Sequence, residues 1–127
     1  MTENEIGTII VESAITVHRE LGPGLLESVY EVALAYELRA RGLKAERQVP
    51  IPSKCKGITF DEGFRAGILV EDRVIVELKS TERATPAHRK QSQTYVRLAE
   101  RRLGYLLNFG EAAMKNGITR AVNGLEE

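Results

Sequence analysis

The chain has very little cysteine and no tryptophan. Its single cysteine, Cys55, excludes an intrachain disulfide, and without a second cysteine or a nearby histidine it is not expected to bind a metal ion. There is no apolar run of membrane length and no signal-like amino terminus. We therefore expect a cytoplasmic protein with a reduced thiol and no membrane partner.

An excess of charge of either sign is also missing, because 18 basic residues balance 18 acidic ones. This neutrality argues against a strongly basic protein that wraps nucleic acid, although it is compatible with a local basic groove. No repeat, low-complexity segment or flexible linker divides the 127 residues. The sequence therefore predicts a single domain over residues 1–127, large enough to bury a core of its own.

Apolar residues recur at helical spacing in three segments, each with start or stop signals. We expect helices from a capping box at Thr2 and Glu5 to about residue 21, from about 26 to 41, and from Thr85 and Pro86 to about 102. Other apolar segments predict strands at 44–51, 57–60, 64–70, 74–79, 103–109 and 118–122, and a short helical stretch at 111–115. Pro50 and Pro52 make the first strand an edge strand or end it. This order predicts a mixed α/β protein.

Two charged residues interrupt the most apolar part of the chain, the segment FRAGILVEDRVIVELK at 64–79. Its apolar runs are typical of strands covered on both faces, where Glu77 and Lys79 are expensive to bury unless they are paired or bind something. A three-residue hairpin loop would place position 67 opposite position 77. Gly67, Glu77 and Lys79 are then expected on one face, because side chains alternate along a strand.

A carboxylate and a lysine two residues apart on a strand point the same way, with about 6–7 Å between their Cα atoms. That spacing suits metal-assisted hydrolysis, in which the carboxylate holds a divalent cation and the lysine orients water or stabilises negative charge. The alternative is that Glu77 and Lys79 lie at a frayed strand end and reach out to solvent. The spacing alone leaves both interpretations open.

Glu27 lies on one helical stripe with Tyr30, Leu34 and Leu38, so it is expected to point partly inward. The alternative is a first-turn glutamate that the positive end of the helix dipole stabilises. Glu37 falls on the same side of the same helix, so an inward-facing glutamate there is not unique.

The helix expected after Thr85 carries a polar stripe, with His88, Gln91 and Tyr95 aligned with Leu98. Its other positions are rich in basic residues: Arg89, Lys90, Arg97, Arg101 and Arg102. A charge run of this kind is usually a solvated face, and the alternative is an edge that contacts the phosphates of a nucleic acid.

Several of these residues fall in motifs that resemble a known family. GLLESVY at 24–30 resembles the signature of the GxxExxY protein family, and ELK at 77–79 resembles the strand motif of the PD-(D/E)XK nuclease superfamily. HRKQSQTY at 88–95 is similar to a histidine followed by the QxxxY motif of RecB-type nucleases, and LLNFG follows at 106–110. The resemblance runs from about Ile6 to Leu125, and the order and spacing of the motifs make it more specific than any motif alone.

The resemblance implies a restriction-endonuclease-like αβββαβ core with an extra N-terminal helix. It also implies phosphodiester cleavage of nucleic acid at a divalent-metal site that uses Mg²⁺ or Mn²⁺. Glu27 and Glu77 would be the metal ligands and Lys79 the catalytic lysine, with Gln91 and Tyr95 as the supporting pair.

One position departs from the family pattern. The first hairpin strand of the family carries Arg-Ala-Asp or a similar triplet, whereas this chain reads Arg65, Ala66, Gly67, so the expected metal-binding aspartate has no side chain. Three hypotheses remain open: a metal-dependent nuclease whose activity is weak or lost, a module that binds nucleic acid or protein without cleavage, and a competent nuclease in which Gly67 is an isolated or introduced change. A homodimer formed through an edge strand is also compatible with the sequence.

Overall fold

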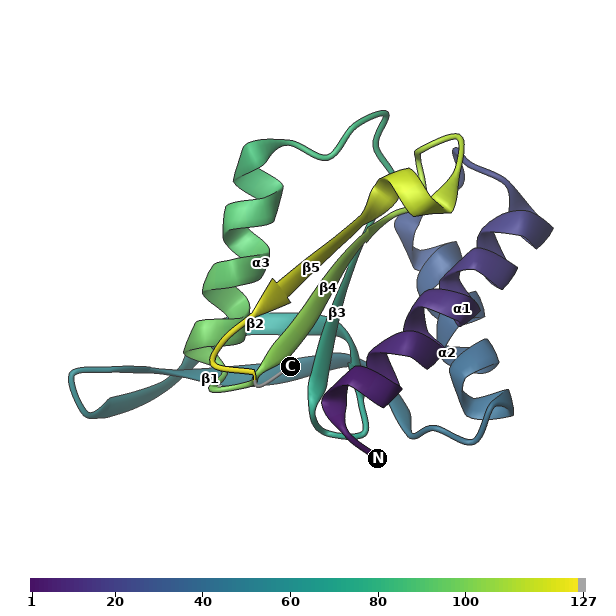
Figure 1. Ribbon diagram of the computed structural model, residues 1–127. Coiled ribbons are helices and arrows are strands. Elements are labelled where there is room, and N and C mark those ends of the chain that lie inside the picture. Colours follow the sequence, from purple (N-terminus) through teal and green to yellow (C-terminus); the bar gives the residue numbers. More distant parts are fainter. Residues whose placement is uncertain (126–127) are drawn as a thin grey trace.

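The structure is a computed structural model that describes residues 1–125, without the side chains of residues 60–62 (Figure 1). Helices α1 (Glu3–Leu21) and α2 (Glu27–Ala40) cover one face of a central sheet, and α3 (Pro86–Leu98) covers the other. None of the helices in the described part of the chain is long and apolar enough to cross a membrane.

The sheet has five strands in the spatial order β1-β2-β3-β4-β5. They are β1 (Ala45–Cys55), β2 (Ile58–Val70), β3 (Val74–Lys79), β4 (Leu103–Asn108) and β5 (Ile118–Val122). Only β3 and β4 are parallel, and α3 forms the crossover between them. The predicted mixed α/β class is therefore confirmed, with α1 added before the αβββαβ order.

Two helix starts follow the predicted capping chemistry. The Thr2 hydroxyl accepts a hydrogen bond from the Glu5 N–H at 3.1 Å, and the Glu5 carboxylate accepts one from the Thr2 N–H at 2.9 Å. At α3 the Thr85 hydroxyl accepts from the His88 N–H at 3.1 Å, and the His88 ring accepts from the Thr85 N–H at 3.2 Å. The side chain of His88 is therefore occupied at the helix start.

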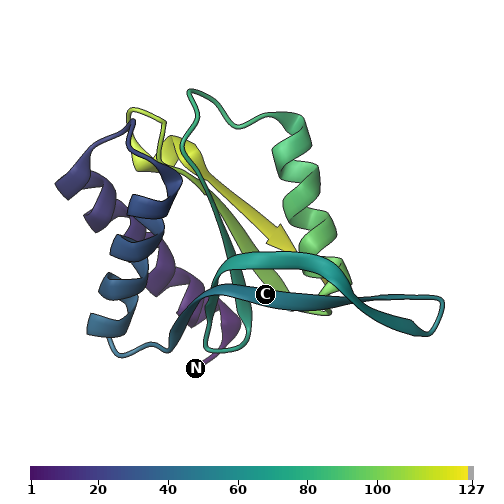
Figure 2. The same cartoon turned by 180° about the vertical axis from the view of Figure 1, so that it is seen from behind.

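The predicted end of the first strand and the separate strand at 57–60 are both wrong. β1 continues through Pro50 and Pro52, and β2 is one continuous strand that pairs with it to form a long arm (Figures 1 and 2). β1 is an edge strand, so a proline in it can be oriented so that its missing N–H would have faced outward, away from the partner strand. Pro52 also lies where the register shifts, between Ile51 and Ser53. Lys56 and Gly57, both with positive φ, form the tight turn at the arm's tip.

Helix α3 is shorter than predicted. It ends at Leu98, and Glu100 adopts a left-handed φ of 55°, so Arg101 and Arg102 lie in the connection to β4 rather than on the helix. The helical stretch expected at 111–115 lies later, as a 3₁₀ turn at Met114–Gly117. No proline marks either boundary, and helix ends that lack such a signal are weakly defined by the local sequence.

Hydrophobic side chains fill both sides of the sheet unequally. The larger core lies between the sheet and α1 and α2, and it includes Val74, Val76 and Leu78 of β3. The smaller core on the α3 side includes Leu69 and Ile75. Since side chains alternate along β3, Glu77 and Lys79 belong to the smaller, α3-facing side.

Candidate active site at the fork between β2 and β3

Strands β2 and β3 pair over only a short distance. Their register joins Val70 to Val74, Leu69 to Ile75 and Ile68 to Val76, which confirms the three-residue loop. Beyond these pairs β2 stays with β1 and leaves β3. We call the place where they separate the fork, and its residues are Gly67 on β2 and Glu77 on β3.

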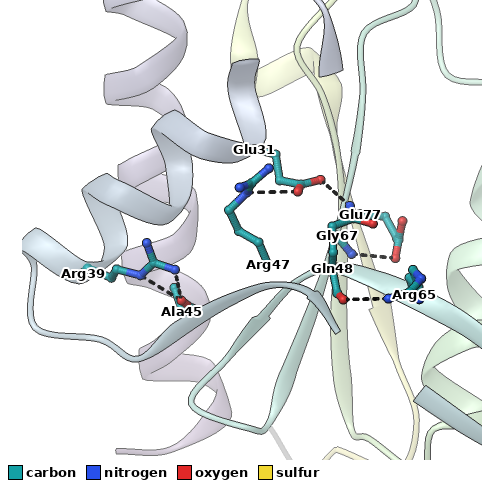
Figure 3. Close-up of polar contacts among 8 residues, drawn as sticks. All are labelled: Glu31, Arg39, Ala45, Arg47, Gln48, Arg65, Gly67 and Glu77. Carbon is teal, nitrogen blue, oxygen red and sulfur yellow. Dashed lines mark hydrogen bonds and ion pairs between the residues drawn. The ribbon is translucent and has the colours of Figure 1, made fainter. Parts of the chain in front are cut away.

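Beyond the last backbone pair of β2 and β3, one contact between a backbone N–H and a side chain still joins the two strands. The Gly67 N–H points at Glu77 Oε1, with 3.4 Å between nitrogen and oxygen (Figure 3). The register ends at the pair of Ile68 and Val76, so position 67 does not pair with position 77 as predicted. The glycine instead brings its backbone N–H to the Glu77 side chain, and an added Cβ would lie 3.2 Å from Leu78 Cδ1, whose side chain belongs to the larger core rather than to the face of Glu77.

Burial raises the pKa of Glu77 from its ordinary 4.5 to about 7. The Gly67 N–H and the positive charge of Lys79 act in the opposite direction, whereas the negative charges of Glu31 and Glu27 raise this pKa further. Glu77 is therefore a poorly solvated carboxyl group close to other carboxylates, which is an arrangement that a bound cation would relieve.

Lys79 is half-buried at the end of β3, opposite Asn108 of β4. No ion pair joins it to a carboxylate of the residues that the structure describes. Glu77 pairs with Leu106 of β4 on one side and contacts the Gly67 N–H of β2 through its side chain on the other, so it does not lie at a frayed strand end. The two charges on this face are thus neither a closed ion pair nor a solvated strand end.

A third carboxylate, which sequence reasoning missed, reaches the fork from α2. Glu31 is only 7% exposed, and its Oε1 lies 3.1 Å from Arg47 Nε while its Oε2 accepts from Gln48 Nε2 at 2.9 Å (Figure 3). A Cβ atom on residue 67 would lie 3.5 Å from that Oε2. The available signal was its position beside Tyr30, one turn after Glu27 on the buried side of α2.

Gln48 reaches Glu31 from an unusual backbone conformation. Its φ is 53°, in the left-handed region, where a residue other than glycine, asparagine or aspartate is uncommon. The β1–β2 ladder pairs Arg47 with Ile68 and Val49 with Ala66, and it skips the pair between Gln48 and Gly67. Strain of this kind, about 1–3 kcal/mol, persists only where the surrounding structure enforces it.

Glu27 is exposed, so the prediction that it points partly inward is wrong. It lies in the first turn of α2, beyond the part of the helix that packs on the sheet, although its charge still contributes to the raised pKa of Glu77. Glu37 is half-buried and pairs with Arg41 at 3.4 Å.

Helix α3 contributes Tyr95 to the surroundings of Glu77. Its ring stacks on Phe64, with 3.8 Å between ring centroids and 6° between the planes. Burial raises the pKa of the Tyr95 phenol, and the negative charge of Glu77 raises it further. Gln91 is exposed and makes no hydrogen bond with another described residue.

Three of the basic residues proposed for phosphate contacts, Arg89, Lys90 and Arg97, are exposed on α3. Arg101 is different, because its guanidinium donates to the Ala99 carbonyl at 3.0 Å and lies 3.3 Å from Asp72 Oδ1. Its contacts tie the end of α3 to the hairpin loop.

The carboxylates near the fork offer at most a reduced set of protein ligands to a divalent cation. The described residues contain no group of three or more His, Cys, Asp or Glu side chains placed to hold a metal ion, and Gly67 offers none. Mg²⁺ usually takes one or two carboxylates and completes its shell with water, which Glu77 with Glu31 or Glu27 can satisfy.

A family model covers most of the chain. The model of the PD-(D/E)XK nuclease superfamily matches residues 4–121, from the start of α1 into β5. No curated protein and no solved structure gave a match. Since the match spans nearly all of the sheet and all three helices, the chain belongs to the PD-(D/E)XK nuclease superfamily.

Proposed function

We propose that this chain binds nucleic acid and a divalent cation at the fork and hydrolyses phosphodiester bonds slowly. Members of the superfamily generally use divalent metal ions. The observation that carries the proposal is the poorly solvated Glu77 carboxyl at the point where two strands separate. It lies on the same face of β3 as Lys79, which forms no ion pair with the residues that the structure describes.

Each residue of the proposed site has a defined task. A bound divalent cation would supply Lewis acidity, polarising a phosphoryl oxygen and lowering the pKa of bound water. Glu77 would hold that cation together with Glu27 at the start of α2. The Lys79 ammonium orients the attacking water or stabilises negative charge on the phosphate, and Tyr95 and Gln91 support this side of the fork from α3.

Gly67 is the reason for expecting slow hydrolysis. The superfamily pattern supplies a carboxylate at this position, and its absence removes negative charge that would offset the cation. We infer Mg²⁺ or Mn²⁺ as the cation, and the GLLESVY segment supports placement in the GxxExxY family within the superfamily.

The same glycine favours a second candidate function, a module that binds nucleic acid or protein without cleavage. Where the ligand is nucleic acid, the exposed basic residues of α3, Arg89, Lys90 and Arg97, would contact its phosphates in both candidates. For that ligand the two functions differ only in whether the fork supports hydrolysis.

Cleavage of plasmid and single-stranded oligonucleotide, with Mg²⁺ or Mn²⁺ against EDTA, tests the proposal. We expect slow cation-dependent cleavage that Lys79→Met abolishes, since removal of a charge-stabilising group lowers rates by about 10²–10³. Lys56→Met, at the exposed tip of the arm, is the matched control and should cleave normally. Retention of nucleic acid with no cation-dependent cleavage at any protein concentration would favour the second candidate.

A further inference from the structure

We infer that Glu31, in place of the exposed Glu27, is the second carboxylate that binds the divalent cation with Glu77 at the fork, where position 67 lacks a side chain, and that Arg47 and Gln48 orient it. This inference rests on the proposed function. It assigns a role to a residue that lies outside the sequence motifs, on the buried face of α2.

Glu31 lies beside position 67. A side chain on residue 67 would begin 3.5 Å from Glu31 Oε2, so the carboxylate of α2 stands beside the place where a hairpin carboxylate would start. The Gly67 N–H meanwhile contacts Glu77. Glu31 and Glu77 therefore approach the same glycine from two different layers of the fold, as Figure 3 shows.

The space at position 67 is also tight for a new side chain. An added Cβ would lie 3.1 Å from the Val76 carbonyl oxygen and 3.2 Å from Leu78 Cδ1, which is tighter than ordinary contact. The fork is thus packed around a glycine, with Glu31 already in the neighbouring position.

Hydrogen bonding leaves Glu31 free to bind a cation. A carboxylate offers about four acceptor sites on its two oxygens. Arg47 and Gln48 use one on each oxygen, so acceptor capacity remains on both. Metal-binding carboxylates are commonly fixed by such outer hydrogen bonds, and the loss of those partners weakens metal binding by about 10–100-fold.

The backbone of Gln48 separates this role from a purely structural one. An ion pair between Glu31 and Arg47 would by itself fasten α2 to β1, and it would not require Gln48 to adopt a left-handed φ of 53°. That conformation interrupts the ladder opposite Gly67 and delivers the amide to Glu31 Oε2, the oxygen that faces the fork. The strained backbone of Gln48 therefore positions the amide that orients the Glu31 carboxylate.

Titration of the full chain with Mn²⁺ alone, by calorimetry at fixed pH and without nucleic acid, tests the inference. Glu31→Gln should weaken Mn²⁺ binding at least about tenfold. Glu37→Gln is the matched control, because Glu37 is on the same helix and pairs with Arg41 instead, and its affinity should stay within about twofold of wild type. Glu77→Gln tests whether the cation binds at the fork.

Three outcomes separate this inference from the function on which it rests. Loss of affinity in Glu31→Gln and Glu77→Gln but not in Glu37→Gln supports both. Loss in Glu77→Gln alone overturns the role of Glu31 and leaves the proposed function standing. Unchanged affinity in Glu31→Gln and in Glu77→Gln overturns the inference and the proposed function alike, because the cation would then bind elsewhere.

A second variant decides the matter if Glu31→Gln does not fold, as judged by far-ultraviolet circular dichroism. Gln48→Gly removes the amide and relieves the left-handed strain, so it should raise the melting temperature and still weaken Mn²⁺ binding by roughly tenfold. A stabilised Gln48→Gly protein that binds Mn²⁺ like wild type would reduce Glu31 to a structural partner of Arg47 and overturn the inference.

Discussion

The two faces of β3 share one backbone and differ in almost everything else. Val74, Val76 and Leu78 face α1 and α2 and are fully or almost fully buried, in the larger core. Ile75, on the opposite face, is equally buried, but Glu77 and Lys79 beyond it are not. The change begins where β2 separates from β3. From that point on, the face of β3 toward α3 carries the polar side chains of the candidate site, whereas the opposite face stays packed in the core.

The largest effect should come from the packed face. Leu78→Ala removes a buried side chain and should lower the free energy of unfolding by about 2–5 kcal/mol. Lys79→Met, one residue away on the other face, should change it by less than about 1 kcal/mol. Urea denaturation measures both. If Lys79→Met were as destabilising as Leu78→Ala, the two faces would be equally structural and the contrast would fail.

The pH dependence of stability should sharpen the contrast. The folded-state pKa of Glu77 is raised to about 7 from 4.5, so between these values the unfolded chain ionises this group while the folded chain keeps it protonated. The contribution of Glu77 to stability is therefore fully present below about pH 4.5 and is lost as pH rises through 7, a change of about 3 kcal/mol.

Glu77→Gln should remove this loss. In EDTA, the stability of the variant relative to wild type is expected to rise between pH 4.5 and 7 and then level off. Urea denaturation across the pH range, with Glu37→Gln as the control, checks the curve. A difference between Glu77→Gln and wild type that stays constant with pH would show that Glu77 is well solvated.

A smaller effect is expected from filling the fork. Gly67→Ala should lower the free energy of unfolding by about 1 kcal/mol, because its Cβ would crowd Val76 and Leu78. Gly67→Asp should lower it further in EDTA, since its carboxylate joins Glu31 and Glu77. Thermal unfolding with and without Mn²⁺ should show greater stabilisation by the cation for Gly67→Asp than for Gly67→Ala. Equal stabilisation would place the cation site away from position 67.

The hairpin and its polar face could be predicted from the sequence. The tripeptide between Val70 and Val74 set the register of the hairpin, and strand alternation placed Glu77 and Lys79 on one face of β3. Gly67 lies beyond the last pair of this register and meets Glu77 only through its backbone N–H. These relationships are local, because they depend on residues close along the chain and on a period of two. The strand motif and the missing carboxylate could therefore be recognised before any tertiary contact was known.

Glu31 could not be predicted in the same way. Helical periodicity does not separate it from Glu37, and it becomes buried only because β1 brings Arg47 and Gln48 against α2. Glu27 was misplaced for the converse reason, since a stripe defined by Tyr30 and Leu34 does not reveal that the first turn lies beyond the packed region. Both depend on how α2 meets the sheet, which is a long-range property of the fold.

The prolines of β1 have a consequence for aggregation. β1 is the longest stretch of free sheet edge in the described part of the chain, and such an edge is a template on which further strands can add. Pro50 and Pro52 provide no N–H donor, and the exposed Lys54 and Lys56 would place like charges side by side in a stack of copies. Addition of a further strand to the β1 edge is therefore disfavoured, and any homodimer is expected to form through another surface.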